Sequence, residues 1–193
     1  MRNILLKSAV ALALGIPLVA GAESNFTTAA AGTVAATARV DFSIIIPKFV
    51  SLRVGTTGAG NFDLITFSPT AAQVDAGTTP ISGTGGDATG GAVNAIVRGN
   101  NGQIALTATS SAGGLASGTD VIPFSQITTT STGGTGLLAP ILTNGASLAA
   151  ISPTLTGTKI TNQSATWTYR YLNSAVVAAG TYAGTVTYTA TMP

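Results

Sequence analysis

Histidine and cysteine are absent from the 193-residue chain, and charged residues make up only 7% of it. The usual general base, the usual zinc ligands and the thiol nucleophile are therefore all missing. Glycosidase chemistry would require that isolated acids such as Asp41, Asp63 and Asp87 converge, although acids between strands are normally solvated turn residues. We predict a protein that is not an enzyme, with no catalytic residues, no metal and no cofactor.

The first 22 residues have the layout of a secretory signal peptide. Arg2 and Lys7 give a positive start, the apolar run AVALALGIPLVA follows, and Ala20-Gly21-Ala22 is a small-x-small cleavage site. The run is short for a transmembrane helix, and no later segment approaches the required length of about 18 apolar residues. We expect cleavage after Ala22 and export of a mature chain without an anchor of its own.

The expected mature chain is electrically neutral. Without Arg2 and Lys7, six basic residues balance six acidic ones. Such sparse and balanced charge provides no basic field for nucleic acid or for an anionic membrane. A neutral chain with 45% hydrophobic residues is also poorly protected against self-association. Self-association is a hazard for a monomer and acceptable for a subunit that polymerises.

Short β-rich runs recur along the chain, separated by segments rich in glycine, threonine and asparagine. Their positions are 49–54, 61–67, 92–99, 103–109, 121–127, 165–172 and 181–192. Asn101-Gly102 is the strongest hairpin signal, because both residues tolerate a positive φ. The pattern predicts an all-β sandwich or barrel without an amphipathic helix. Residues 107–160 show the least regular pattern, and their strand layout stays open.

Hydrophobic residues keep one parity over an unusually long stretch near the start of the expected mature chain. The even positions from 34 to 46 are all apolar and end in Val40, Phe42, Ile44 and Ile46. Carried back, the same parity includes Phe26 and Ala30, with Thr28 as a polar interruption. A strand of this length exceeds what one sheet of a small domain normally uses.

The last 29 residues hold Trp167 and all four tyrosines. Trp167, Tyr169 and Tyr171 share one parity along a predicted strand. A second set with one parity consists of Tyr182, Val186, Tyr188 and Met192. We interpret these aromatic residues as core, because they bury the most area per residue. An aromatic platform for sugars is the functional alternative.

Both ends of the chain resemble pilins that are assembled by the chaperone-usher pathway. VAATARVDFSI (34–44) is similar to the N-terminal extension and first strand of the cysteine-free, colonisation-factor type. In that type a T-A-x-V-D-x-x-I run occupies this place, here Thr37, Ala38, Val40, Asp41 and Ile44. AAGTYAGTVTYTATMP (178–193) resembles the closing strand of the same pilins and of spore-coat-U-like secreted domains. The chain departs from many such pilins in having Met192-Pro193 where an aromatic residue is next to last.

The resemblance implies an immunoglobulin-like β-sandwich that lacks its last strand and is completed by a donor strand of the next subunit. Residues 23–36 would be the donor-strand extension and residues 37–193 the pilin-like domain, with about 38–46 as its own first strand. The expected donor face consists of Phe26, Thr28, Ala30, Gly32, Val34 and Ala36. The expected groove or C-terminal strand carries Tyr182, Val186, Tyr188 and Met192.

The function implied by the resemblance is that of a structural subunit of a surface fimbria or pilus. Its partners would be further copies of itself in a head-to-tail polymer, a periplasmic chaperone and an outer-membrane usher, and a host or abiotic surface. Two other classes stay open. A secreted β-sandwich adhesin or glycan-binding module would pack residues 26–36 on its own domain. An outer-membrane β-barrel fits the alternation and the signal peptide, but the chain lacks a terminal aromatic residue.

Overall fold

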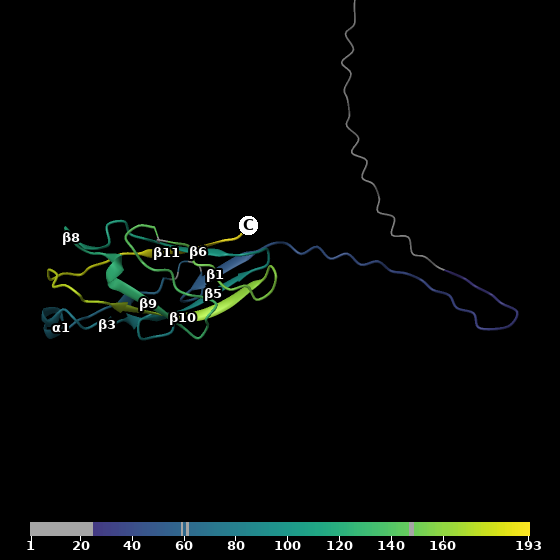
Figure 1. Cartoon of the computed structure of the whole chain (residues 1–193), viewed down its shortest axis with the longest axis horizontal. Helices are drawn as coiled ribbons and strands as arrows, with labels where there is room; N and C mark the ends of the chain where they lie inside the picture. The colour runs from purple at the N-terminus through teal and green to yellow at the C-terminus, as the bar shows by residue number, and fades with distance from the viewer. Residues whose placement is uncertain (1–24, 59, 61, 147–148) are drawn as a thin grey trace, which may run out of the picture. The chain divides into compact units, whose positions relative to one another are not determined.

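The computed structural model describes residues 25–193 except 59, 61, 147 and 148 (Figure 1). The predicted signal peptide lies outside the described residues. The chain divides into two units, one that ends at Ile46 and one that begins at Pro47.

The unit of residues 47–193 is all-β, as predicted, apart from a short helix and one 3-10 turn. Its main sheet has the order β1 (Val50–Val54), β5 (Ala92–Gly99), β10 (Thr161–Tyr171) and β3 (Ile81–Ser82), and β9 (Ile127–Thr132) also pairs with β10. A second sheet pairs β11 (Val186–Thr191) with β6 (Ala105–Ser110). All of these pairs are antiparallel. In Figure 1, β6 and β11 form one layer, and β1, β5 and β10 lie in the other.

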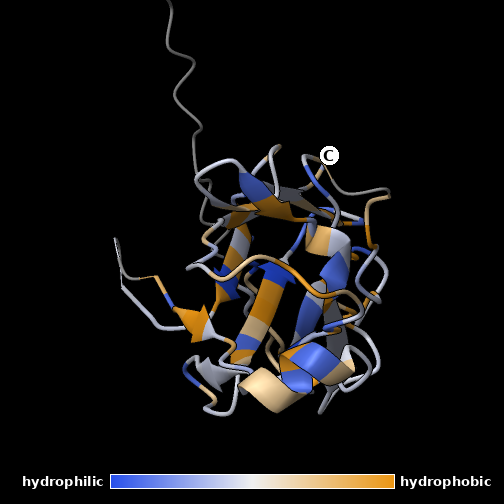
Figure 2. Cartoon of the chain, turned by 90° about the vertical axis from the view of Figure 1, so that its left-hand side faces the viewer, coloured by the Kyte–Doolittle hydropathy of each residue, from blue (hydrophilic) through white to orange (hydrophobic). Residues whose placement is uncertain are grey.

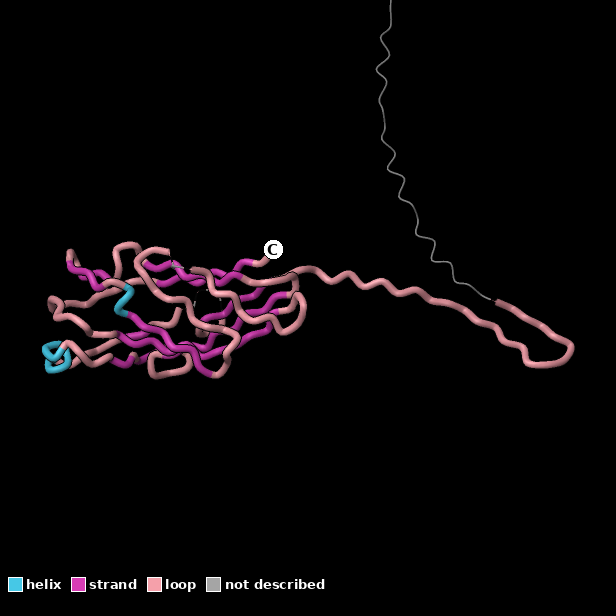
Figure 3. Tube along the Cα trace, in the orientation of Figure 1, coloured by secondary structure: helices cyan, strands magenta, loops and turns pink. Residues whose placement is uncertain are grey.

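Two smaller ladders and two helical segments complete this unit. The ladders pair β2 (Ile65–Thr66) with β4 (Thr84–Gly85), and β7 (Leu115–Ser117) with β8 (Asp120–Ile122). The helical segments are α1 (Ala71–Ala76) and the 3-10 turn η1 (Phe124–Gln126). Most of residues 133–160, in the segment whose layout the sequence left open, are loop with two isolated β-bridges (Figure 3).

Alternation along the strands separates the core from the outer faces. In β5, Val93, Ala95 and Val97 are buried, whereas Arg98 is exposed. Figure 2 shows the same change of hydropathy along the strands. From β10 the core receives Trp167, Tyr169 and Tyr171, which confirms the interpretation of these three rings as core. Leu106 and Ala108 of β6 supply the facing layer.

The predicted hairpin at Asn101-Gly102 is wrong. β5 and β6 flank these residues but belong to different sheets, β5 between β1 and β10, and β6 beside β11. Gly102 does have a positive φ of 113°. The side-chain amide of Asn101 donates to Pro193 O at 2.7 Å, and Gly102 N donates to Lys159 O at 3.0 Å. The turn therefore carries the chain from one sheet to the other.

The strand predicted over about 38–46 as the first strand of the body is also wrong. None of the described residues from 25 to 49 belongs to a strand, and the first strand of the body, β1, begins at Val50. The reason is that alternation shows which residues share a face, while a strand also needs a hydrogen-bonding partner. Residues 37–46, expected within the domain, lie in the N-terminal unit (Figure 3).

Candidate functional site

Residues 25–46 expose every side chain. The large hydrophobic ones among them are Phe26, Val34, Val40, Phe42, Ile44, Ile45 and Ile46, and all except Ile45 have even numbers. In an extended conformation the even positions share one face. Arg39 and Asp41 lie at odd positions and form an exposed ion pair with a shortest N–O distance of 2.7 Å. The segment therefore has the pattern of a strand with one apolar and one polar face.

In the body, β1 and β11 are neighbouring edge strands of the two sheets. Among the described residues, β1 forms a ladder with β5 alone, and β11 with β6 alone. A Cβ on Gly99, the partner of Val50 in β5, would lie 2.9 Å from the sulfur of Met192. The end of β11 thus meets the start of β1, so the two strands run in opposite directions.

Hydrogen bonds at the strand ends show which backbone groups face the open sides. Gly55 N donates to Asn94 O at 2.8 Å, so the odd residues of β1 face β5. Thr185 O accepts from Ser111 N at 2.9 Å, so the odd residues of β11 face β6. Because the facing direction alternates, the even residues of both strands direct N–H and C=O groups to the open sides. These residues are Val50, Leu52 and Val54 in β1, and Val186, Tyr188 and Ala190 in β11.

The side chains along these open edges are hydrophobic and only half-buried. The residues that pack against the core from the two strands and from Met192 are Leu52, Val54, Val186, Tyr188, Ala190 and Met192. We call the outward backbone groups of β1 and β11, together with these six side chains, the open edge. An edge of this kind can accept another strand by backbone hydrogen bonds, while its apolar side chains contact alternate residues of that strand.

Tyr188 attaches the open edge to the main sheet. Its ring centroid lies 5.2 Å from that of Trp167, and its hydroxyl lies 2.8 Å from the hydroxyl of Tyr169. Burial raises the pKa of Tyr188 to about 12, although the hydrogen bond with Tyr169 lowers it in part. Burial, together with the nearby Tyr188, also raises the pKa of Tyr169. Both phenols therefore stay neutral at physiological pH and form a cross-sheet contact.

The structure brings together one of the two predicted groups of site residues. Val186, Tyr188 and Met192 lie in β11 or directly after it, and Tyr182, which packs on the same core, donates its hydroxyl to Ala178 O at 2.8 Å. The predicted donor residues are exposed in the N-terminal unit: Phe26, Thr28, Ala30, Gly32, Val34 and Ala36. Leu52 and Val54 were not predicted from the sequence, although their shared parity in the run FVSLRV was a usable signal.

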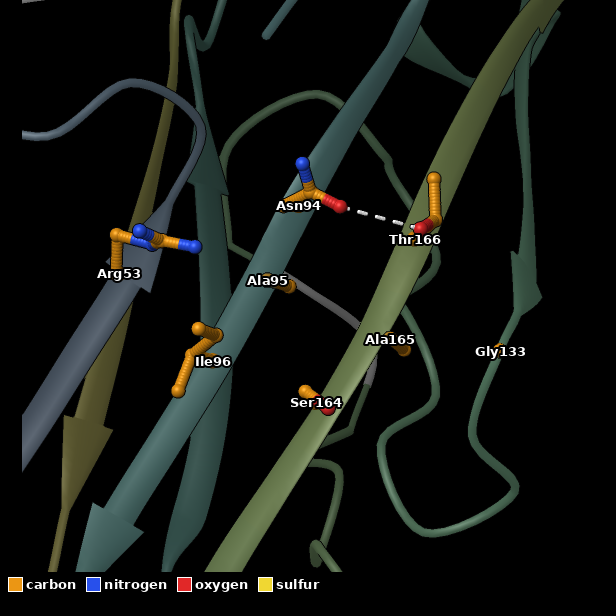
Figure 4. A pocket seen from close by; sticks show the side chains of 8 residues that line it. All are labelled: Arg53, Asn94, Ala95, Ile96, Gly133, Ser164, Ala165 and Thr166. Atoms are coloured by element: carbon orange, nitrogen blue, oxygen red, sulfur yellow. Dashed lines mark hydrogen bonds between the residues drawn. The ribbon is translucent and has the colours of Figure 1, made fainter. Parts of the chain in front are cut away.

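A second candidate site, also missed from the sequence, is a shallow hollow on the outer face of the main sheet (Figure 4). Its lining residues are Arg53, Asn94, Ala95, Ile96, Gly133, Ser164, Ala165 and Thr166. Thr166 donates its hydroxyl to the side-chain oxygen of Asn94 at 3.2 Å. Asp87 accepts from the backbone and side-chain nitrogens of Asn94, at 2.7 and 3.2 Å. These bonds hold one side of the hollow in place.

The described part of the chain contains no group of three or more metal-ligating side chains that would hold an ion. Nor does any helix within it have the length and hydrophobicity needed to cross a membrane. Comparison of the chain with protein-family models, with curated proteins and with solved structures finds no match.

Proposed function

We propose that the chain is the structural subunit of a surface fimbria, an incomplete immunoglobulin-like β-sandwich that polymerises by donor-strand exchange. The observation that carries this proposal is the exposed alternating segment of residues 25–46. A stretch with this many exposed hydrophobic side chains at one parity is unfavourable in water unless another surface covers it. The open edge of β1 and β11 is also unfavourable in water when it is uncovered, because it presents unpaired backbone groups beside apolar side chains.

Donor and acceptor are compatible in length only if part of the segment docks. β1 has five residues and β11 has six, so the open edge spans about 20 Å. The face from Phe26 to Ile46 would span about 70 Å at the same rise per residue. One open edge therefore accepts about a third of the segment.

The hydrophobic content of the segment favours its second half as the docked part. Val40, Phe42, Ile44 and Ile46 place four large side chains on seven residues, with exposed fractions of at least 71%. The first half, with the predicted face from Phe26 to Ala36, has only Phe26 and Val34 as large residues. We therefore place residues 40–46 in the open edge of the next subunit, and keep the face of residues 26–36 as the alternative register.

Each chain carries both a donor segment and an acceptor, the open edge, at separate places, and this arrangement leads to a polymer. Each subunit that receives a strand still offers its own, so growth is head to tail and gives an open fibre. Because β1 and β11 run in opposite directions, a donor between them is antiparallel to one and parallel to the other; we place its antiparallel ladder, which is the more stable one, on the longer strand β11. Before assembly, a periplasmic chaperone would cover the open edge, and an outer-membrane usher would export the subunit to the cell surface.

Negative-stain electron microscopy of sheared surface protein, labelled with an antibody against residues 47–193, tests the proposed function. We expect labelled fibres. The matched control is the same strain with residues 26–46 deleted, in which the body should be exported but fibres should be absent. Label on single particles in the medium, or on fibres that persist after the deletion, would contradict the proposal.

A further inference from the structure

The outer face of the main sheet has an uneven distribution of charge. Cross-strand partners share a face, which places Arg53 and Arg98 on this side of β1 and β5. Arg170 lies on the same side of β10, because it has the parity of Asn162, the partner of Arg98. β1, β5, β9 and β10 contain no aspartate or glutamate. The neutral net charge of the expected mature chain therefore hides a local excess of positive charge, with half of its six basic residues on one sheet face.

Arg53 differs from the other two arginines in its surroundings. It is half-buried, lies opposite Ile96 in the ladder, and lines the hollow shown in Figure 4. Arg98 is exposed and donates to the side-chain oxygen of Asn162 at 3.2 Å. Arg170 is exposed and lies outside the hollow.

The guanidinium of Arg53 has no protein acceptor among the described residues, and its Nε is shielded from solvent without a hydrogen-bond partner. Asp87, which accepts from the backbone and side-chain nitrogens of Asn94, forms no salt bridge with Arg53 among the described residues. A shielded donor without an acceptor is unfavourable, and such groups are rare in folded proteins. An external ligand cannot reach the shielded Nε, so the donors available to a ligand are the terminal nitrogens of Arg53, which extend toward the hollow in Figure 4.

We propose that this hollow binds the carboxylate of an acidic sugar, with Arg53 as the carboxylate-binding residue. The planar guanidinium matches a carboxylate through two parallel N–H donors. Ser164 and Thr166 add hydroxyl groups that suit sugar hydroxyls, and Ile96 offers an apolar surface for the C–H groups of a sugar ring. The strands of this face hold no aspartate or glutamate, and a ligand carboxylate at Arg53 has to stay clear of Asp87, which is bonded to Asn94 at one side of the hollow. This site uses neither the donor segment nor the open edge, so it does not depend on polymerisation.

Equilibrium dialysis of the mature protein against a galacturonic acid tetramer tests the site, and it is applicable to monomer and polymer alike. The methyl ester of the same tetramer keeps the sugar but removes the charge. We expect Arg53→Gln to weaken binding of the acid by about tenfold or more, since one hydrogen bond between charged groups accounts for that much. Arg53→Lys, which keeps the charge and loses the planar fork, should also weaken it.

Arg170→Gln is the matched control, because it removes the same charge from the same face outside the hollow. It should weaken binding by less than about threefold, as for an exposed charge. A second variant, Ser164→Asp, changes an exposed position and is expected to fold; its carboxylate should block the hollow. Equal losses in Arg53→Gln and Arg170→Gln, equal binding of the ester, no binding by the wild type, or full binding by Ser164→Asp would each overturn the assignment.

Discussion

Replacement of Phe42 by aspartate is the substitution expected to abolish assembly while leaving the fold intact. The side chain of Phe42 is 89% exposed in the free chain. Burying it in a neighbouring subunit would contribute about 1.5–3 kcal/mol to association. Forcing a carboxylate into the same apolar site costs several kcal/mol, whether the group is desolvated or neutralised. Together, about 5 kcal/mol corresponds to a loss of more than about a thousandfold in the association constant.

Ser43→Asp is the matched control, because it adds the same charge one residue later, at the opposite parity. Its carboxylate would stay in water, so polymerisation should be nearly unchanged. The assay is the polymer ladder on a native gel, with sedimentation as a second readout. Both substitutions lie outside the compact unit of residues 47–193, so the thermal midpoint of the body should be unchanged in both variants.

A second pair of substitutions, at Val34 and Thr33, decides which half of the segment docks. Val34→Asp should block assembly, and Thr33→Asp should not, if the face of residues 26–36 is the donor. We expect the Phe42 and Ser43 pair to differ strongly, and the Val34 and Thr33 pair to differ little. If instead the Val34 and Thr33 pair differs strongly and the Phe42 and Ser43 pair differs little, the donor is the face of residues 26–36. Equal polymer in all four variants, or equal loss, would refute an alternating donor strand in this segment.

Three further predictions concern the body. Tyr188→Ala should lower the free energy of unfolding by about 3–5 kcal/mol, through burial and cavity terms, whereas the exposed neighbour Thr187→Ala should change it by less than about 0.5 kcal/mol in urea denaturation. Gly91→Ala should destabilise the body more than Gly90→Ala. Both glycines have a positive φ, but only a Cβ at position 91 would meet backbone, 2.6 Å from Gly83 Cα. Equal thermal midpoints of the two variants would contradict this prediction. Burial raises the pKa of Tyr188 to about 12, above the unfolded value of about 10, so the unfolded state loses its proton first and stability should fall from about pH 10 to pH 12. The prediction would be wrong if the free energy of unfolding did not change over that pH range, or if its slope against pH were the same in Tyr188→Phe.

Sequence reasoning succeeded where local pattern and burial coincide. The run at residues 92–99 is β5 from end to end. Trp167, Tyr169 and Tyr171 form a buried face of β10, because side chains of one parity point to one side of a strand. Of the candidate site, Val186, Tyr188 and Met192 were identified from their parity, because the closing strand also has a strict alternation.

Sequence reasoning failed where the outcome depends on which strands pair. Asn101-Gly102 has turn chemistry, but turn chemistry fixes local dihedral angles and not the sheet to which the next strand belongs. Helix α1 was missed although Thr70 and Gln73 form a capping box and Gly77 ends the helix with a φ of 60°. Its six residues bury no side chain, so no hydrophobic period marked it. The hollow around Arg53 combines residues from different strands and has no signal in any one of them.

The open edge is attached to the rest of the body although one side of β11 lacks a partner strand. β11 pairs with β6 along its whole length, and Tyr188 contacts both Trp167 and Tyr169 of the main sheet. An acceptor that is already ordered loses little conformational entropy when a strand arrives, so more of the contact energy appears as affinity. The donor segment is the part that must become ordered, at about 1–2 kcal/mol per backbone residue. For this reason substitutions that stiffen residues 40–46 in an extended form should strengthen assembly, whereas substitutions in β11 should act first on folding.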